Sequence, residues 1–169
     1  MRYVHAPVLL TLYLLLMSVA RAERPAVLPC HPSDITLRTD DSGGLYDGKM
    51  QDGTTLVLRN AGAGACMLPP LPELHFSDAG LKAVIAERRM VRGLHPGPVL
   101  LPVTMATGAE LQIRLRWVAS DAFAGGNCIR PAFVSLDLDG GALTVPFDHQ
   151  MCAAKGQTGY YSQLLTVVP

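Results

Sequence analysis

The fold is decided by ELQIRLRWV, residues 110–118. Apolar and polar side chains alternate along it: Leu111, Ile113, Leu115 and Trp117 share one face, and Gln112, Arg114 and Arg116 share the other. Successive side chains of a β-strand point to opposite faces of a sheet, so a period of two is typical of a strand with one face in an apolar core. Trp117 closes the apolar face, and we expect it in the core rather than on a sugar-binding surface.

Strand-like stretches recur on both sides of this segment. They lie around Ile35 and Leu37 and over residues 54–59, 73–77, 134–139, 143–147 and 163–168. Asp139-Gly140-Gly141 separates two of them and predicts a hairpin, because these residues tolerate positive φ. Residues 81–91 fit either a short helix or a strand. The pattern predicts an all-β fold, an immunoglobulin-like antiparallel β-sandwich of roughly seven to nine strands.

Residues 1–22 have the organisation of a secretory signal peptide. Arg2 supplies a positive start, an apolar run covers residues 6–19, and Ala20-Arg21-Ala22 offers small residues for cleavage after Ala20 or Ala22. The run is shorter than the roughly 20 residues of a membrane-spanning helix. We therefore expect export, to the periplasm or by secretion, and no membrane span after cleavage. An uncleaved membrane anchor is the alternative.

The remaining chain is long enough for one domain with its own core. We expect residues 23–29 to be a flexible lead-in and residues 30–169 to form a single β-sandwich domain. The formal net charge of the whole chain is zero, and cleavage removes Arg2 and Arg21 but no acid. A mature protein without a basic excess has no general attraction for a phosphate backbone, so we expect no nucleic acid among its partners.

All four cysteines lie beyond the predicted signal peptide: Cys30, Cys66, Cys128 and Cys152. An even number of cysteines in an exported chain indicates disulfides, because the compartment is oxidising. Four cysteines allow three pairings.

One segment carries a resemblance to a known family. It reads Leu56-Val57-Leu58-Arg59-Asn60-Ala61-Gly62, then Cys66-Met67-Leu68, then Pro72-Glu73-Leu74. A strand that ends in Asn-x-Gly, followed by Cys-x-Leu, resembles the secreted bacterial family catalogued as domain of unknown function 4232. Pro70-Leu71 stands where that family has Gly-Tyr. The resemblance covers nearly the whole mature chain.

The resemblance implies a sandwich fold, export, and cysteines that pair in sequence order. The favoured pairs are therefore Cys30–Cys66 and Cys128–Cys152. Each closes a loop of roughly 25–40 residues, which contributes on the order of 3–4 kcal/mol in the chain-entropy model. The resemblance implies no activity. Asn60 and Gly62 themselves tolerate positive φ and predict a tight corner between strands.

Soft metal ligands gather in His149-Gln150-Met151-Cys152, and Cys30-His31 adds a second cysteine–histidine pair. Imidazole and thioether groups bind copper or zinc, so a metal-binding envelope protein that uses His149, Met151 and His31 is an alternative function. Oxidised cysteines and loop histidines are the favoured interpretation, and we expect no metal and no cofactor. Asp40-Asp41-Ser42 with Asp47 offers oxygen ligands for calcium, but acidic hairpin turns are common.

A hydrolase is the second alternative, and it is disfavoured. The chain has no Gly-x-Ser-x-Gly motif, and no spacing brings a serine to a base. His75, His95 and Asp78 are residues that only the fold could bring together. We therefore predict no enzyme activity and no catalytic residue.

A basic cluster offers the best binding surface. It consists of Arg88, Arg89 and Arg92, with Arg114 and Arg116 on a polar strand face. Such a surface docks an anionic glycan, a lipid head group or an acidic partner. Tyr160 and Tyr161 follow Gly159 in an expected loop, where both anchor a partner or one packs on the sandwich. The predicted function is an exported, non-catalytic module that binds a protein or a cell-envelope component, through loops such as residues 93–98 and 153–161.

Overall fold

The computed structural model describes residues 26–46, 48, 50–90, 101–120, 123 and 125–167. The predicted signal peptide, the start of the lead-in, Arg92 and the loop of residues 93–98 lie outside these residues. No helix among the described residues has the length and apolar character to cross a membrane.

Seven strands of four or more residues form the framework. They are β1 (Ile35–Asp40), β2 (Gln51–Asn60), β4 (Leu74–Ser77), β8 (Glu110–Val118), β10 (Phe133–Leu138), β11 (Gly141–Pro146) and β13 (Tyr160–Val167). Each of them overlaps one of the stretches that the alternating pattern predicted, and β8 has the predicted bounds.

Six shorter strands and one 3-10 turn complete the described part of the chain. They are β3 (Cys66–Leu68), β5 (Ala83–Val84), β6 (Glu87–Arg88), β7 (Val103–Met105), β9 (Asn127–Ile129), β12 (Met151–Ala153) and η1 (Ser42–Gly44). The predicted range of seven to nine strands is therefore wrong, because the described residues alone form thirteen. A strand of two or three residues is too short to show an alternating pattern. β5 and β6 also show that the strand alternative, not the helix, holds for residues 81–90.

The larger sheet has five strands in the order β1-β2-β8-β13-β6. Its pairs are antiparallel except that β6 runs parallel to β13. The register sets Leu58 opposite Leu111 and Leu56 opposite Ile113. Apolar side chains of neighbouring strands thus share the inner face, and Arg114 and Arg116 fall on the outer face.

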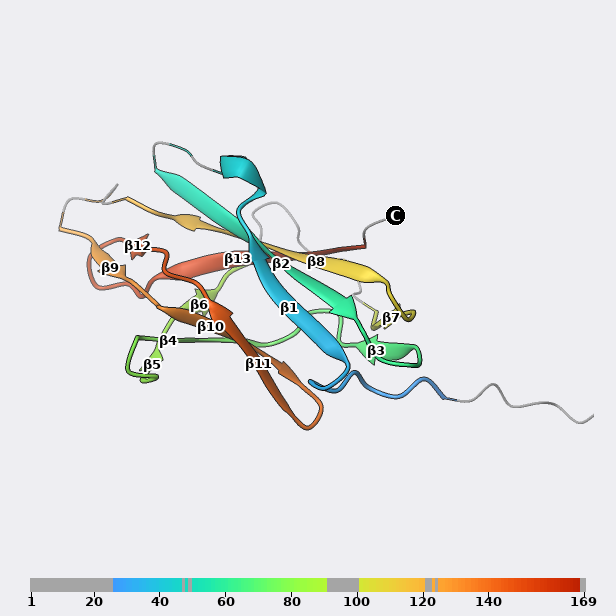
Figure 1. The fold of residues 1–169 in the computed structure, drawn as a ribbon. Coiled ribbons are helices and arrows are strands. Elements are labelled where there is room, and N and C mark those ends of the chain that lie inside the picture. The colour runs from blue at the N-terminus through green and yellow to red at the C-terminus, as the bar shows by residue number, and fades with distance from the viewer. Residues whose placement is uncertain are drawn as a thin grey trace, which may run out of the picture.

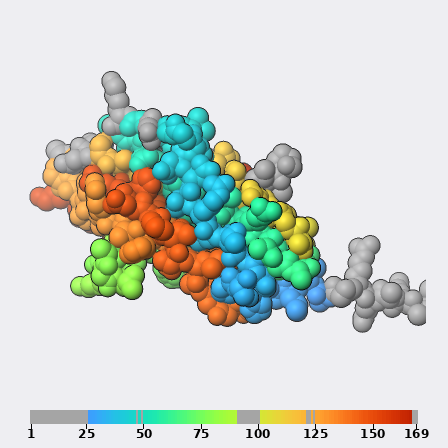
Figure 2. All heavy atoms as spheres, in the orientation of Figure 1, coloured from blue at the N-terminus to red at the C-terminus, as the bar shows by residue number. Residues whose placement is uncertain are grey.

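The second sheet has four strands in the order β11-β10-β4-β5. The predicted hairpin is present, with Leu138 paired to Gly141 and Gly140 in the left-handed region at φ +83°. β1 of the larger sheet lies beside β11 of the smaller one. The two strands close one side of the molecule (Figure 1) and touch along the viewed face (Figure 2).

The inner faces of the two sheets meet in one apolar core. Phe76 of β4 contacts Tyr161 of β13 and Phe147, each with ring centroids 5.2 Å apart. Other fully or nearly fully buried residues come from both sheets: Leu56, Leu58, Leu111, Ile113, Leu115, Trp117, Leu74, Val134 and Leu136. The chain is thus an all-β sandwich, as predicted, and Trp117 lies in its core.

Both predicted disulfides are present, Cys30–Cys66 and Cys128–Cys152. The first ties the chain ahead of β1 to β3, which pairs with β7. The second joins facing residues of β9 and β12. No cysteine is free: one disulfide links the β3–β7 sheet to Cys30 outside it, and the other lies within the β9–β12 sheet.

Asn60 begins the predicted corner after β2, but not through the predicted positive φ. It continues the β2 ladder opposite Ile35, and neither Asn60 nor Gly62 has a positive φ. The fully buried Asn60 amide donates to the carbonyl oxygens of Gly64 (2.9 Å) and Met105 (3.0 Å), and its oxygen accepts from the Gly62 N–H (2.9 Å). Gly62 is needed for space, because a Cβ there would lie 2.9 Å from Cβ of Asp34. The Asn-x-Gly signature thus satisfies buried polar groups and allows close packing.

Candidate functional site

The parallel pairing of β6 with β13 brings two predicted binding residues into contact. Tyr160 is registered with Glu87, and the N–H of Arg89 donates to the carbonyl of Tyr161 at 2.8 Å. The Arg89 guanidinium carbon lies 3.8 Å from the centre of the Tyr160 ring, within cation–π range. Arg88 is exposed on β6, whereas Arg92, the third arginine of the predicted basic cluster, lies outside the described residues.

Tyr161 belongs to the core. The predicted loop is wrong here, because Tyr160 and Tyr161 are the first two residues of β13. Neighbouring residues of a strand face opposite sides of the sheet, so only one of the two tyrosines reaches the outer face. Tyr161 is 3% exposed and packs against Phe76. Tyr161 is therefore not one of the exposed candidate binding residues.

Burial of Tyr161 makes the stability of the folded protein sensitive to a rise in pH in the alkaline range. Loss of hydration raises the pKa of the Tyr161 hydroxyl above its ordinary value of 10.0, against the opposing charge of Arg88. The unfolded chain therefore releases this proton before the folded one does, so the contribution is complete below the ordinary pKa and is lost as pH rises through the raised pKa.

We expect the free energy of unfolding to fall as pH rises above about 10, and Tyr161→Phe to show a smaller fall. Urea denaturation at a series of pH values measures both slopes. The adjacent variant Tyr160→Phe is the matched control and should follow the wild type. Equal slopes for Tyr161→Phe and the wild type would contradict the prediction.

Arg89 and Tyr160 stand at the edge of a groove on the outer face of the five-stranded sheet. The groove has a volume of about 270 Å³. Its lining comes from β2, β8, β13 and the end of the β6 segment: Gln51, Arg89, Met90, Arg116, Trp117, Val118, Tyr160 and Ser162. The described residues of the lining supply two guanidinium groups and no carboxylate. Met90 is 60% exposed, so the groove also offers apolar surface.

Gly53 explains how Arg116 lies along the sheet. The register places Gly53 of β2 opposite Arg116 of β8. A Cβ at residue 53 would lie 2.7 Å from Cδ of Arg116 and 3.1 Å from Cβ of Tyr46. The missing side chain thus leaves room for the Arg116 stem and for Tyr46, whose ring centre is 5.0 Å from the guanidinium carbon. Arg116 is thereby held between Tyr46 and the groove.

A second cavity of about 240 Å³ lies on the other side of Arg116, lined by Tyr46, Arg114, Arg116, Ser162 and Leu164. Within the described part of the chain, neither Arg114 nor Arg116 has a carboxylate within ion-pair distance. The alternation of β8 had indicated a polar face with these arginines. It could not indicate Gln51 and Ser162 in the groove or Tyr46 in the second cavity, because only the tertiary fold brings these residues to Arg116.

A family model described as a domain of unknown function (DUF4232) matches residues 30–168. The chain belongs to the DUF4232 family. The match begins at Cys30 and covers both disulfides, the two sheets and the described lining of the groove. The resemblance to this family that the Asn-x-Gly and Cys-x-Leu segments indicated is therefore confirmed. No curated protein and no solved structure matches the chain.

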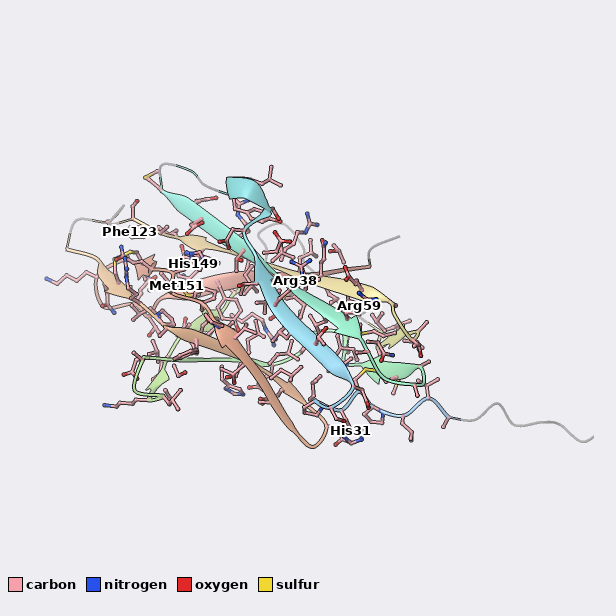
Figure 3. All side chains as sticks on the ribbon, in the orientation of Figure 1. His31, Arg38, Arg59, Phe123, His149 and Met151 are labelled. Carbon is pink, nitrogen blue, oxygen red and sulfur yellow. A yellow bond between two sulfur atoms is a disulfide. The ribbon has the colours of Figure 1, made fainter. Side chains whose placement is uncertain are left out.

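The DUF4232 fold separates the residues of the metal alternative. Figure 3 shows His31 well away from His149 and Met151. His31 lies 3.6 Å from Asp139 of the β10–β11 turn, Met151 is fully buried, and Cys152 is bonded to Cys128. The structure does not bring His149, Met151 and His31 together as one set of ligands.

His149 instead joins two acids of the DUF4232 chain. Its Nδ1 lies 3.3 Å from Asp52 and its Nε2 lies 3.6 Å from Asp41, while its ring packs on Trp117 and Phe147. The two carboxylates approach opposite nitrogens of the ring, so they do not converge on a common point. The side chain is 21% exposed. This arrangement fastens the segment after β11 to β2 and to the β1–β2 connection.

The acids proposed for calcium are engaged by neighbouring groups. Asp40 accepts from Arg38 (2.8 Å) and from the Ser42 N–H (2.8 Å), and the hydrogen bond from Arg38 is the main reason that the pKa of Asp40 is lowered. Asp41 accepts from the Thr54 hydroxyl at 2.7 Å. Asp47 lies outside the described residues.

Another set of potential metal ligands lies on the outer face of the four-stranded sheet. One ligand atom from each of Glu73, His75 and Asp137 lies within 4.8 Å of the others. Nε2 of His75 is already 2.7 Å from Asp137, and these side chains are 55% and 48% exposed. Water therefore competes with any ion here.

The hydrolase alternative named His75, His95 and Asp78. His75 is hydrogen-bonded to Asp137, and Asp78 accepts from the N–H groups of Gly80 and Lys82. His95 lies outside the described residues.

Proposed function

We propose that this DUF4232 protein is an exported, non-catalytic module that docks a protein or a cell-envelope component in the groove between Arg89 and Arg116. The observation that carries the proposal is the Arg89 guanidinium stacked 3.8 Å from the Tyr160 ring at the edge of this groove. Tyrosine and arginine are enriched among the residues that dominate binding energy at protein interfaces. Met90 adds exposed apolar surface beside them.

The stacking prepares both side chains for binding. A free arginine loses rotamer freedom when it docks, which costs roughly 0.5–1.5 kcal/mol. Contact with Tyr160, together with the 3.4 Å contacts to Glu87 and Gln157, already restricts Arg89 in the unbound protein. The rigid sheet beneath fixes Tyr160 and Arg116 relative to each other. A partner would therefore meet a preformed surface.

Two features support export. Residues 1–22 have the signal-peptide pattern, and all four cysteines of the chain are paired. Disulfides persist in oxidising compartments and are rare in the reducing cytosol.

The test is affinity purification of the tagged full-length protein from an envelope extract. The double variant Arg89→Ala/Tyr160→Ala should recover roughly tenfold less of a specific partner than the wild type. Arg59→Ala, which removes an arginine at the other end of β2, is the matched control and should recover as much as the wild type. N-terminal sequencing of the recovered protein should show cleavage after Ala20 or Ala22. Equal recovery by the double variant, or turnover of a substrate by the purified protein, would contradict the proposal.

A further inference from the structure

The groove has an uncompensated positive charge. Its two charged lining residues are Arg89 and Arg116, and no acidic side chain lines it among the described residues. Glu87 neutralises Arg89 only in part, because Oε2 of Glu87 lies 3.4 Å from Nη2 of Arg89 and both side chains are exposed to solvent. Arg116 has no ion pair with any described residue. A ligand with a negative charge would therefore complement the groove.

Arg116 also has more donors than acceptors around it. Its Nε is buried and has no acceptor among the described residues, and its Nη2 contacts the Gln51 amide oxygen at a long 3.5 Å. The buried Nε is out of reach of a ligand, but the exposed Nη2 has only this long contact with the described residues, so it can donate to a ligand in the groove that supplies oxygen acceptors. Arginine presents its donors as a planar fork that matches carboxylate and phosphate oxygens.

The volume limits the size of the ligand group. About 270 Å³ is slightly below the range of roughly 300–1,000 Å³ that is usual for small-molecule sites. It accommodates one oxyanion and a short part of the group that carries it. The ring of Tyr160 and the side chain of Met90 provide an apolar wall for that carrier.

We propose that the groove recognises a single oxyanion, a carboxylate or a phosphate, held between Arg116 and Arg89 with Gln51 and Ser162 as additional polar contacts. The inference rests on the proposed function in assigning this oxyanion to the docked partner. The charge and donor arrangement of the groove is independent of that assignment. Arg116 is the principal residue, because Arg89 already shares its guanidinium with Tyr160 and Glu87.

The test is a titration of the exported, disulfide-bonded protein with inorganic phosphate and, separately, with acetate, followed by NMR of the arginine Nε–H signals. The signals of Arg116 and Arg89 should shift saturably with at least one of the two anions, whereas chloride at equal ionic strength should produce no saturable shift. Phosphate against acetate distinguishes the two oxyanion classes. Arg116→Gln should weaken the affinity by roughly tenfold to a hundredfold.

Arg59→Gln is the matched control, because it removes the same charge six residues along β2 from Gly53, the residue opposite Arg116, which is about 20 Å at the usual rise per residue. It should leave the affinity unchanged, and thermal denaturation should show that both variants fold. No saturable shift with either anion, or equal affinity in Arg116→Gln, would overturn the inference. If Arg116→Gln still recovers the partner that Arg89→Ala/Tyr160→Ala loses, the oxyanion inference fails and the proposed docking function stands. If phosphate or acetate saturates the groove but no partner depends on it, the docking function fails and the oxyanion site stands.

Discussion

Replacement of Trp117 by alanine is expected to lower the free energy of unfolding by about 3–5 kcal/mol. Trp117 is 3% exposed and lies on the inner face of β8, the central strand of the five-stranded sheet. Its ring packs against Phe147 (5.2 Å) and His149 (5.1 Å) between ring centres. Truncation would remove the largest side chain of this cluster and leave a cavity. It would also loosen His149, which holds Asp41 and Asp52 together.

Urea denaturation followed by circular dichroism measures this effect, because the substitution removes the only tryptophan of the chain. Trp117→Phe is the control: it keeps an aromatic ring, so we expect it to lose less than half as much stability as the alanine variant. A loss below about 1 kcal/mol for Trp117→Ala is typical of a surface residue. Such a result would contradict the core assignment and favour the alternative in which Trp117 binds a sugar.

Removal of the Cys30–Cys66 disulfide in the double variant Cys30→Ala/Cys66→Ala is expected to cost about 4 kcal/mol. The bond closes a loop with a sequence separation of 36 residues, so its loss frees a large part of the unfolded chain. Cys128→Ala/Cys152→Ala, with a separation of 24, should cost about 3 kcal/mol. Chemical denaturation of each oxidised variant gives the two values.

Both losses together, about 7 kcal/mol, fall within the roughly 5–15 kcal/mol that stabilises an ordinary domain. We therefore expect a large unfolded fraction when both pairs are removed, or when the protein is made in a reducing cytosol. The double variants, rather than single ones, are the correct comparison because a single substitution leaves a thiol that can form new bonds. Stability equal to the wild type in both double variants would contradict the entropic account.

The groove and the disulfides place different demands on the fold. The disulfides hold the short sheets β3–β7 and β9–β12, where few residues contribute backbone hydrogen bonds. The groove depends instead on the outer face of the long strands β2, β8 and β13. Loss of a disulfide should therefore affect stability more than binding, and substitutions at Arg89 or Arg116 should have the opposite effect.

Alternation predicted the long strands because it is a local property. In β8 every second side chain is buried, from Leu111 to Trp117, as the period of two requires. Most of the short strands escaped prediction, and residues 81–91 stayed open between a helix and a strand, because the pairing of short strands depends on distant partners. β6, for example, is a strand only where Glu87 and Arg88 lie beside Tyr160 and Tyr161.

The candidate site could be predicted only in part, because its residues come from segments that are far apart in the sequence. Arg89 and Tyr160 were recognisable as candidate binding residues by their chemistry. Their contact was not, since it joins residues 71 positions apart through a parallel pair. Which of Tyr160 and Tyr161 packs on the sandwich stayed open, because a placement in a loop gives no rule for the direction of a side chain, whereas a strand assigns adjacent residues to opposite faces.

The amino-acid order alone determined that this chain is an all-β domain with long half-buried strands, because side-chain alternation and turn residues act over a few neighbouring positions. Only the tertiary structure decided which side chains meet. It placed Arg116 beside Gly53 and Tyr46, buried Tyr161, and turned Asn60 into a buried hydrogen-bonding clamp. Each of these contacts joins different strands, and the register between strands is settled by packing of the whole core rather than by any single segment.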